Sequence, residues 1–211
     1  MPLRYVALGD SYTIGTSVEA RERFPDQLVE ALATGTPPVP LALVANLGVD
    51  GYTSADLIRD ELPAMATLAP DLVTLLIGVN DAVRRVPVAR YEANVLTILD
   101  ALRSRLPADR IVTIAIPDYT VTPAGSDYGD PRQGHDAIVA NNEVMARLAA
   151  ARGIAFVDTF GASLEAAHDR TLVASDGLHP SGAQYARWVE HIAPVVRALS
   201  GPSAARGGGR R

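Results

Sequence analysis

The feature that most constrains the fold of this chain is a series of apolar segments of strand length, separated by amphipathic segments of helix length. The apolar segments span residues 5–8, 41–47, 72–77, 111–116 and 154–157. They are apolar throughout rather than alternating, which is typical of parallel strands that are covered by helices on both faces. The pattern therefore predicts an α/β fold around a parallel sheet.

The segments between these strands have helical periodicity. Helices are predicted over 24–33, after Thr53, over 91–106, over 141–151 and over 185–199. Thr53 and Asp56 match a capping box at a helix start, and Pro180 suits the first turn of the last helix. Five strands with helices between them favour a three-layer α/β/α sandwich with the flavodoxin-like strand order 2-1-3-4-5.

The composition is that of one globular domain. Of the 211 residues, 48% are hydrophobic and 20% are charged, which is enough for a buried core. We expect a single domain over 1–200, followed by a flexible Gly/Arg-rich tail over 201–211. The net charge of −5 argues against a nucleic-acid partner. With no cysteine, disulfides, thiolate zinc sites and cysteine nucleophiles are excluded.

Two kinds of membrane signal are missing from the sequence. No charged leader with an apolar stretch of ~7–15 residues opens it, and no apolar stretch reaches the ~20 residues of a membrane span. We therefore expect a cytoplasmic protein without a membrane span. Secretion stays open if a leader precedes this sequence.

Residues that carry chemistry come directly after several of the predicted strands. They are Gly9-Asp10-Ser11 after the first strand, Gly48 after the second, Gly78-Val79-Asn80-Asp81 after the third, and Asp176-Gly177-Leu178-His179 ahead of the last helix. Ligands of open parallel sheets bind outside the carboxyl ends of the strands. With the strand order 2-1-3, the first three sets are neighbours, so we expect all four sets to meet at one edge.

This set of groups suits acyl transfer. A serine hydroxyl such as that of Ser11 needs a base to take its proton, and an imidazole such as that of His179 can do so. Asp176 lies three residues before His179, so a short turn can pair the carboxylate with the ring. The Ser11 N–H, the Gly48 N–H and the Asn80 side-chain NH₂ are candidate donors to an oxyanion.

In their order along the chain these four sets resemble the blocks of the SGNH (GDSL-type) hydrolase family. The resemblance runs from Gly9 to His179, and Tyr12 stands where the family pattern has leucine. It implies hydrolysis of small carboxylic esters through an acyl-serine intermediate, with no cofactor and no metal. The implied catalytic residues are Ser11 as nucleophile, His179 as base and Asp176 as its partner, and the implied oxyanion donors are Ser11, Gly48 and Asn80.

Other interpretations of the same residues stay open. Ser11 alone could cap a helix, and Asn80 and Asp176 could be turn formers. A thioesterase, a lysophospholipase or an acyltransferase could use the same site, and a non-catalytic binding module could keep the fold. The nucleophile elbow of the α/β-hydrolase fold is not supported, because Thr13 stands where its last glycine should be.

The long segment 118–134 is expected to be a loop that overhangs the site. Loops of this length often bind ligands or close over them. Tyr119 and Tyr128 are therefore possible members of the substrate pocket, although an exposed loop is equally compatible with the sequence. Short acyl chains are the favoured substrates. The other histidines match no metal-binding pattern.

Overall fold

The computed structural model describes residues 1–200 and contains one five-stranded sheet. The strands are β1 (Leu3–Gly9), β2 (Leu41–Asn46), β3 (Leu72–Leu76), β4 (Ile111–Ile114) and β5 (Ala155–Val157). Every neighbouring pair is parallel, and the order is β2-β1-β3-β4-β5. The predicted α/β fold and strand order are confirmed.

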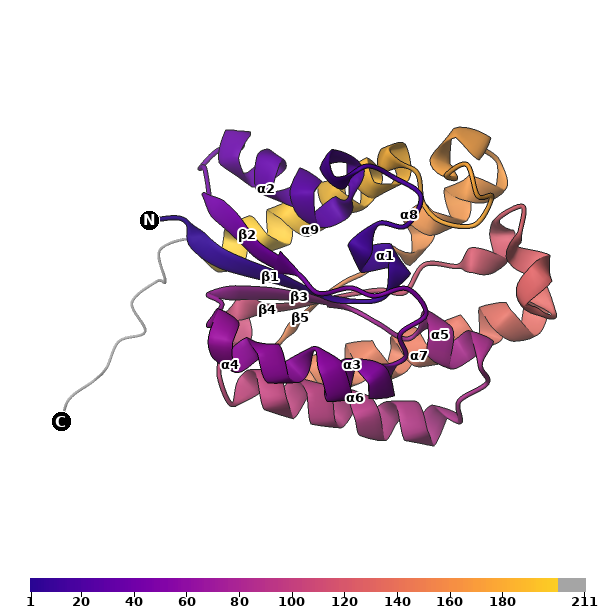
Figure 1. The fold of residues 1–211 in the computed structure, drawn as a ribbon, viewed down its shortest axis with the longest axis horizontal. Helices are drawn as coiled ribbons and strands as arrows, with labels where there is room; N and C mark the ends of the chain where they lie inside the picture. The colour runs from indigo at the N-terminus through magenta and orange to yellow at the C-terminus, as the bar shows by residue number, and fades with distance from the viewer. Residues whose placement is uncertain (201–211) are drawn as a thin grey trace.

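Helices cover both faces of the sheet (Figure 1). On one face lie α1 (Ser11–Ile14), α2 (Phe24–Thr34), α8 (Phe160–Leu164) and α9 (Gly182–Ser200). On the other lie α3 (Ser54–Asp60), α4 (Met65–Leu68), α5 (Val79–Val83), α6 (Val88–Arg103) and α7 (Pro131–Ala150). Because the strands are parallel, the turns that follow them gather at one edge, where α1 and α5 begin.

The core lies between the central strands and these helices. The side chains of β3 are buried along its whole length, as expected for a central strand of a parallel sheet. Tyr185 and Trp188 of α9 are fully buried beneath α2 and α1, where the Trp188 ring packs edge-on against Tyr12. This packing holds the short helix α1 against the much longer α9.

The helix boundaries differ from the predicted ranges by a few residues in several places, and at the starts of two helices the local contacts explain the difference. Helix α7 begins at Pro131 rather than at residue 141, because the Asp130 side chain accepts hydrogen bonds from the N–H groups of Arg132 and Gln133 and proline suits the first turn. The predicted long loop is therefore shorter and contains two 3₁₀ turns. Helix α9 begins at Gly182, so Pro180 lies before it and pairs with Val173 in a β-bridge.

Two further predictions concern the C-terminal tail and the absence of a membrane span. The predicted tail 201–211 lies outside the described residues. Among residues 1–200, none of the helices has both the length and the apolar character needed to cross a membrane.

Candidate active site

The turn after β1 presents Ser11 at the first position of α1. Gly9 has a φ of 151°, a conformation that favours glycine, and an added Cβ would collide with the Leu76 carbonyl oxygen. The Asp10 side chain caps α1, with its Oδ1 accepting the N–H of Tyr12 at 3.0 Å. The Ser11 hydroxyl makes no hydrogen bond to any other residue of 1–200. Asp10 therefore does the capping, and the Ser11 hydroxyl is left available for chemistry.

Asp176 and His179 form a hydrogen-bonded pair in the loop before α9. The His179 Nδ1 lies 2.6 Å from the Asp176 Oδ2, while the N–H groups of Leu178 and His179 donate to the Asp176 Oδ1 at 2.9 and 3.0 Å. An ionised carboxylate can only accept, so the proton of this bond belongs to Nδ1. The lone pair of the neutral ring then lies on Nε2, the nitrogen that a general base uses.

The surroundings of Asp176 keep its carboxylate ionised. Partial burial acts to raise the pKa of Asp176. Hydrogen bonds donated by the Ser17 hydroxyl, the Leu178 N–H and the His179 ring and N–H outweigh this burial and hold the pKa well below its usual range. Asp176 is therefore charged throughout the pH range in which a histidine base works, as a partner for an imidazolium must be.

Ser11, Asn80 and His179 line one hollow of about 290 Å³ at the carboxyl ends of the strands. The Tyr12 ring packs edge-on against the His179 ring with 5.7 Å between their centroids. The described residues show no hydrogen bond between the Ser11 hydroxyl and the His179 ring. In ligand-free sites such bonds are often long and tighten when substrate binds. The structure thus brings the three side chains to one cavity, with the serine and the ring not yet bonded.

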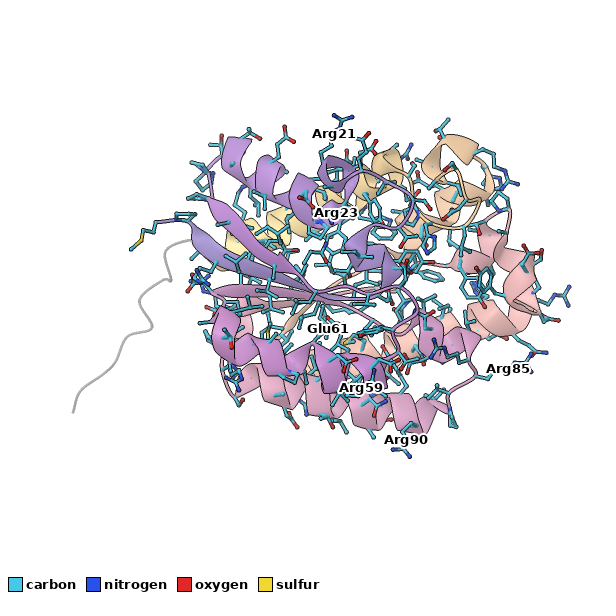
Figure 2. The ribbon with its side chains drawn as sticks, viewed as in Figure 1. Arg21, Arg23, Arg59, Glu61, Arg85 and Arg90 are labelled. Carbon is cyan, nitrogen blue, oxygen red and sulfur yellow. The ribbon has the colours of Figure 1, made fainter. Side chains whose placement is uncertain are left out.

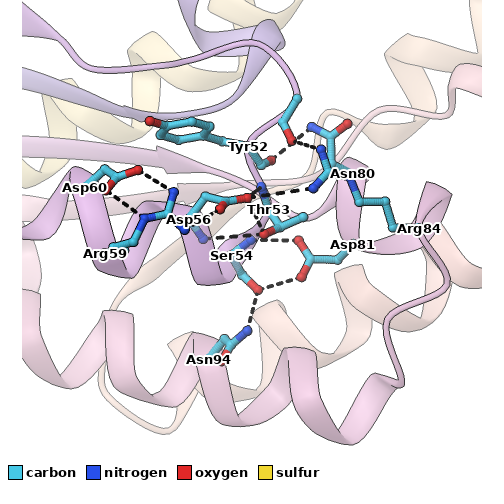
Figure 3. Close-up of polar contacts among 11 residues, drawn as sticks. Tyr52, Thr53, Ser54, Asp56, Arg59, Asp60, Asn80, Asp81, Arg84 and Asn94 are labelled. Atoms are coloured by element: carbon cyan, nitrogen blue, oxygen red, sulfur yellow. Dashed lines mark hydrogen bonds and ion pairs between the residues drawn. The ribbon is translucent and has the colours of Figure 1, made fainter.

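Asn80 lies in the first turn of α5 and is held by a polar network (Figure 3). Its Nδ2 donates one hydrogen bond to the Tyr52 carbonyl at 2.9 Å. The neighbouring Asp81 accepts the Ser54 N–H at 2.8 Å and the Ser54 hydroxyl at 2.6 Å, which ties α5 to the start of α3. A side-chain amide has two N–H groups. The second N–H of Asn80 makes no hydrogen bond within residues 1–200, and Asn80 lines the hollow that also contains Ser11.

Gly48 lies in the loop after β2, packed against α1. An added Cβ would lie 2.6 Å from the Ile14 nitrogen and 2.7 Å from the Asp10 carbonyl oxygen, so only glycine fits there. The Gly48 N–H donates to the Asn46 Oδ1 at 3.1 Å. Asp50 and Gly51, from the same loop, line the hollow, but Gly48 is not part of the lining formed by the described residues. The glycine therefore has a packing role, and its N–H is already engaged.

Tyr119 and Tyr128 both line the hollow. Their rings are in edge contact, with 6.2 Å between centroids. Tyr119 is buried, whereas Tyr128 is 46% exposed. A second hollow of about 290 Å³ adjoins the first and shares Val83 and both tyrosines as a wall. The two hollows lie on either side of this wall, and together they are called the groove.

Two carboxyl groups are buried at the Ser11 turn: Asp10, which lies in the turn, and Glu61, which the sequence analysis missed. Glu61 points toward the sheet from the end of α3 (Figure 2), and its Oε2 accepts the Gly9 N–H at 3.0 Å. Burial raises the pKa of Glu61 to about 9 and that of Asp10 to about 8, so both are protonated at neutral pH. Glu61 carries no recognisable local signal, because only the tertiary fold brings it under β1.

These raised pKa values predict that the protein loses stability as pH rises. An unfolded carboxyl releases its proton near pH ~4, but folded Asp10 and Glu61 keep theirs to about 8 and 9. The free energy of unfolding should fall between these limits, by at most about 1.4 kcal/mol per pH unit and group. The Glu61→Gln variant should lose less stability than wild type between pH 6 and 9, as measured by Tm. Glu30→Gln, at an exposed position on α2, is the matched control, and its Tm should change with pH as that of wild type does. The same dependence of Tm on pH in all three proteins would contradict the raised pKa of Glu61.

A second histidine–aspartate pair lies outside this hollow. The His135 Nδ1 lies 2.6 Å from the Asp118 Oδ2, and the Asp118 carboxylate also accepts the N–H and hydroxyl of Thr120. His135 does not line either hollow of the groove. No cluster of three or more His, Cys, Asp or Glu side chains within residues 1–200 is arranged to hold a metal ion. We assign the second pair a bracing role in the loop after β4.

A comparison with known protein families shows which family this chain belongs to. A sequence profile of the GDSL-like Lipase/Acylhydrolase family matches residues 7–187. The chain belongs to that family. The matched span includes Ser11, Asn80, Asp176 and His179, and membership supports ester hydrolysis as the class of activity. No curated protein sequence matches the chain.

Solved structures share the fold of this GDSL-family chain. A structure of TesA is 23% identical, with a TM-score of 0.73, covering 93% of this chain and 99% of the other. The W215I variant of Axe2, an acetyl xylan esterase from Geobacillus stearothermophilus, is 20% identical, with a TM-score of 0.71 and coverages of 92% and 94%. The esterase EstA from Pseudoalteromonas sp. is 16% identical, with a TM-score of 0.68 and coverages of 92% and 97%. At these identities the likeness establishes the fold alone.

Proposed function

We propose that this GDSL-family chain is a serine esterase that hydrolyses small carboxylic esters through an acyl-serine intermediate. The observation that carries the proposal is the single hollow lined by Ser11, Asn80 and the Asp176-paired His179. A nucleophile, an oxyanion donor and an oriented base are the groups that acyl transfer to water needs.

The proposed reaction uses His179 twice. Its Nε2 takes the proton of the Ser11 hydroxyl while the Ser11 oxygen attacks the ester carbonyl. The imidazolium, stabilised by the ionised Asp176, then gives that proton to the leaving alcohol. In the second half His179 takes a proton from water, which attacks the acyl-serine. The acid leaves as Ser11 regains its proton.

The oxyanion that forms at each attack is proposed to be held by N–H groups at the starts of α1 and α5. The Ser11 N–H has no acceptor within α1 because it lies in the first turn, and Asn80 has its second side-chain N–H available. Gly48 is the third proposed donor, and its N–H would have to be shared between the Asn46 Oδ1 and the oxyanion. Ser11 and Asn80 are therefore the stronger donors in this arrangement.

The size of the cavity supports short acyl chains. The hollow at Ser11, about 290 Å³, lies at the small end of the ~300–1,000 Å³ range of ligand sites. Axe2 and EstA, described as an acetyl xylan esterase and an esterase, are fold relatives that fit this class of substrate. We propose that Tyr119 and Tyr128 contact the substrate along the groove.

A panel of p-nitrophenyl esters from acetyl to palmitoyl tests the proposal. Wild type should turn over the short esters with a higher kcat/KM than the long ones. No turnover of any ester in the panel would contradict an esterase, and a preference for palmitoyl would contradict the assigned substrate size.

Replacing Asn80 with alanine tests the proposed oxyanion site. The Asn80→Ala variant should have a kcat lower by ~10²–10³ with little change in KM, because the donor acts where charge develops in the transition state. Asn94→Ala is the matched control, since Asn94 donates to the Ser54 hydroxyl in the same network but does not line the hollow. Its kcat should stay close to that of wild type. An Asn80→Ala effect confined to KM would contradict the oxyanion role.

A further inference from the structure

Ser17 makes a contact with the candidate active site that the family motifs do not include. Its hydroxyl donates to the Asp176 Oδ2 at 2.6 Å, and the same oxygen lies 2.6 Å from the His179 Nδ1. The two bonded residues are 159 positions apart in the sequence. The Ser17 hydroxyl therefore makes a long-range contact with the Asp176 Oδ2, the atom that orients the His179 ring.

Ser17 is the donor that ties Asp176 to the rest of the site. The other hydrogen bonds to this carboxylate within residues 1–200 come from Leu178 and His179, which belong to the same loop and move with it. Ser17, by contrast, follows α1. The N–H groups of Gly15 and Thr16 both donate to the Ser11 carbonyl, which fixes the turn that leads from Ser11 to Ser17.

The backbone of Ser17 supports a functional reason for this contact. Its φ of 67° lies in the left-handed region, which a residue other than glycine adopts at a cost in free energy. Strained conformations of this kind gather at functional sites. A glycine here would avoid the strain but would lose the hydroxyl.

We propose that Ser17 is a positioning residue, whose hydroxyl links the Asp176–His179 pair to the turn that carries Ser11, so that the ring can reach the Ser11 hydroxyl when substrate binds. The inference rests on the proposed function. Ser17 does not line the hollow with Ser11, so its removal should change the chemical step and leave substrate binding alone.

Three substitutions at Ser17 separate the effect of losing the hydroxyl, read in kcat, from the effect of the backbone conformation, read in Tm. Ser17→Ala and Ser17→Gly both remove the hydroxyl, and kcat should fall roughly 10-fold in each with KM unchanged. Ser17→Gly should have a higher Tm than Ser17→Ala, because glycine suits the positive φ. Ser17→Thr keeps the hydroxyl on a β-branched residue that this φ disfavours, so its Tm should fall while its kcat stays near that of wild type.

A double-mutant cycle and a remote control complete the experiment. In an Asp176→Asn background the Ser17→Ala change should have little further effect, because the two groups act as one unit. Thr171→Ala removes a hydroxyl–carboxylate bond of the same 2.6 Å length, to Asp169, away from the hollow, and should keep the wild-type kcat.

The outcomes distinguish this inference from the proposed function. An inactive wild-type protein would overturn both. An active wild type that loses turnover in Ser11→Ala, together with Ser17→Ala and Ser17→Gly variants that keep their kcat, would overturn the role of Ser17 alone. A kcat that follows Tm across the three Ser17 variants would equally contradict positioning through the hydroxyl.

Discussion

Replacing Ser11 with alanine should abolish ester turnover, by up to about 10⁶-fold in kcat, while the fold stays intact. The hydroxyl is the proposed nucleophile, and Ser11 is the only serine, threonine or cysteine among the described residues that line the hollow. The loss should not extend to stability, since the Ser11 hydroxyl makes no hydrogen bond to another residue of 1–200 and Asp10 supplies the helix cap. The measurements are kcat on a short p-nitrophenyl ester and Tm.

Ser54→Ala is the matched control for this prediction. Ser54 opens α3 as Ser11 opens α1, and it is also buried, but its hydroxyl donates to Asp81 and it does not line the hollow. Its removal leaves a buried carboxylate short of a donor, which costs about 1–3 kcal/mol. We expect Ser54→Ala to lose stability but to keep far more turnover than Ser11→Ala, because the Ser54 N–H still donates to Asp81. Full activity in Ser11→Ala would contradict the account.

Replacing Asp176 with asparagine should lower kcat by about 10⁴-fold. The Oδ1 position accepts two backbone N–H groups, so the oxygen of the new amide should stay there and its NH₂ should face the His179 Nδ1. A donor at this place favours the ring tautomer with its proton on Nε2, and that nitrogen can then no longer act as the base. The effect should appear in kcat, measured with the same ester.

Asp169→Asn is the matched control for the Asp176 variant. Asp169 also accepts a backbone N–H and a hydroxyl, from Thr171, but it does not line the hollow. Its substitution should keep the wild-type kcat. An Asp176→Asn protein as active as Asp169→Asn would show that the His179 tautomer is not set by Asp176.

The fold was predictable from the sequence because its signals are local and repeated. Uniformly apolar segments mark parallel strands, and a five-strand α/β pattern leaves few compact topologies. The Thr53–Asp56 capping box was predicted and is present in the structure. The start of α7 was also encoded locally, by Asp130 followed by Pro131, but the polar face of its first turns concealed the helical periodicity.

The sequence predicted those site residues that come directly after strands or that lie close to one another in the chain. Ser11 and Asn80 come directly after strands, so the strand order alone places them together. The Asp176–His179 pair could be anticipated because three residues separate its members, and the structure shows the hydrogen bond. The catalytic and oxyanion roles of these residues stay predictions.

The contacts of Ser17 and Glu61 could not have been read from the sequence. Ser17 meets Asp176 across 159 positions, and its positive φ has no signature in a serine. Glu61 reads as an ordinary polar residue after a short helix, yet it accepts the Gly9 N–H 52 positions away. In both cases the tertiary fold, and not a local pattern, creates the contact.

Covalent labelling tests the central claim most directly. A p-nitrophenyl phosphonate mimics an ester and leaves its phosphorus on an activated serine, so peptide mass spectrometry can locate the adduct. We expect one phosphonyl group per chain, on the peptide that contains Ser11. Esterase activity should be lost in proportion to the labelling. The Ser11→Ala variant should carry no adduct. A stoichiometric adduct on another residue, or the same labelling in Ser11→Ala, would contradict the assignment of Ser11 as the nucleophile.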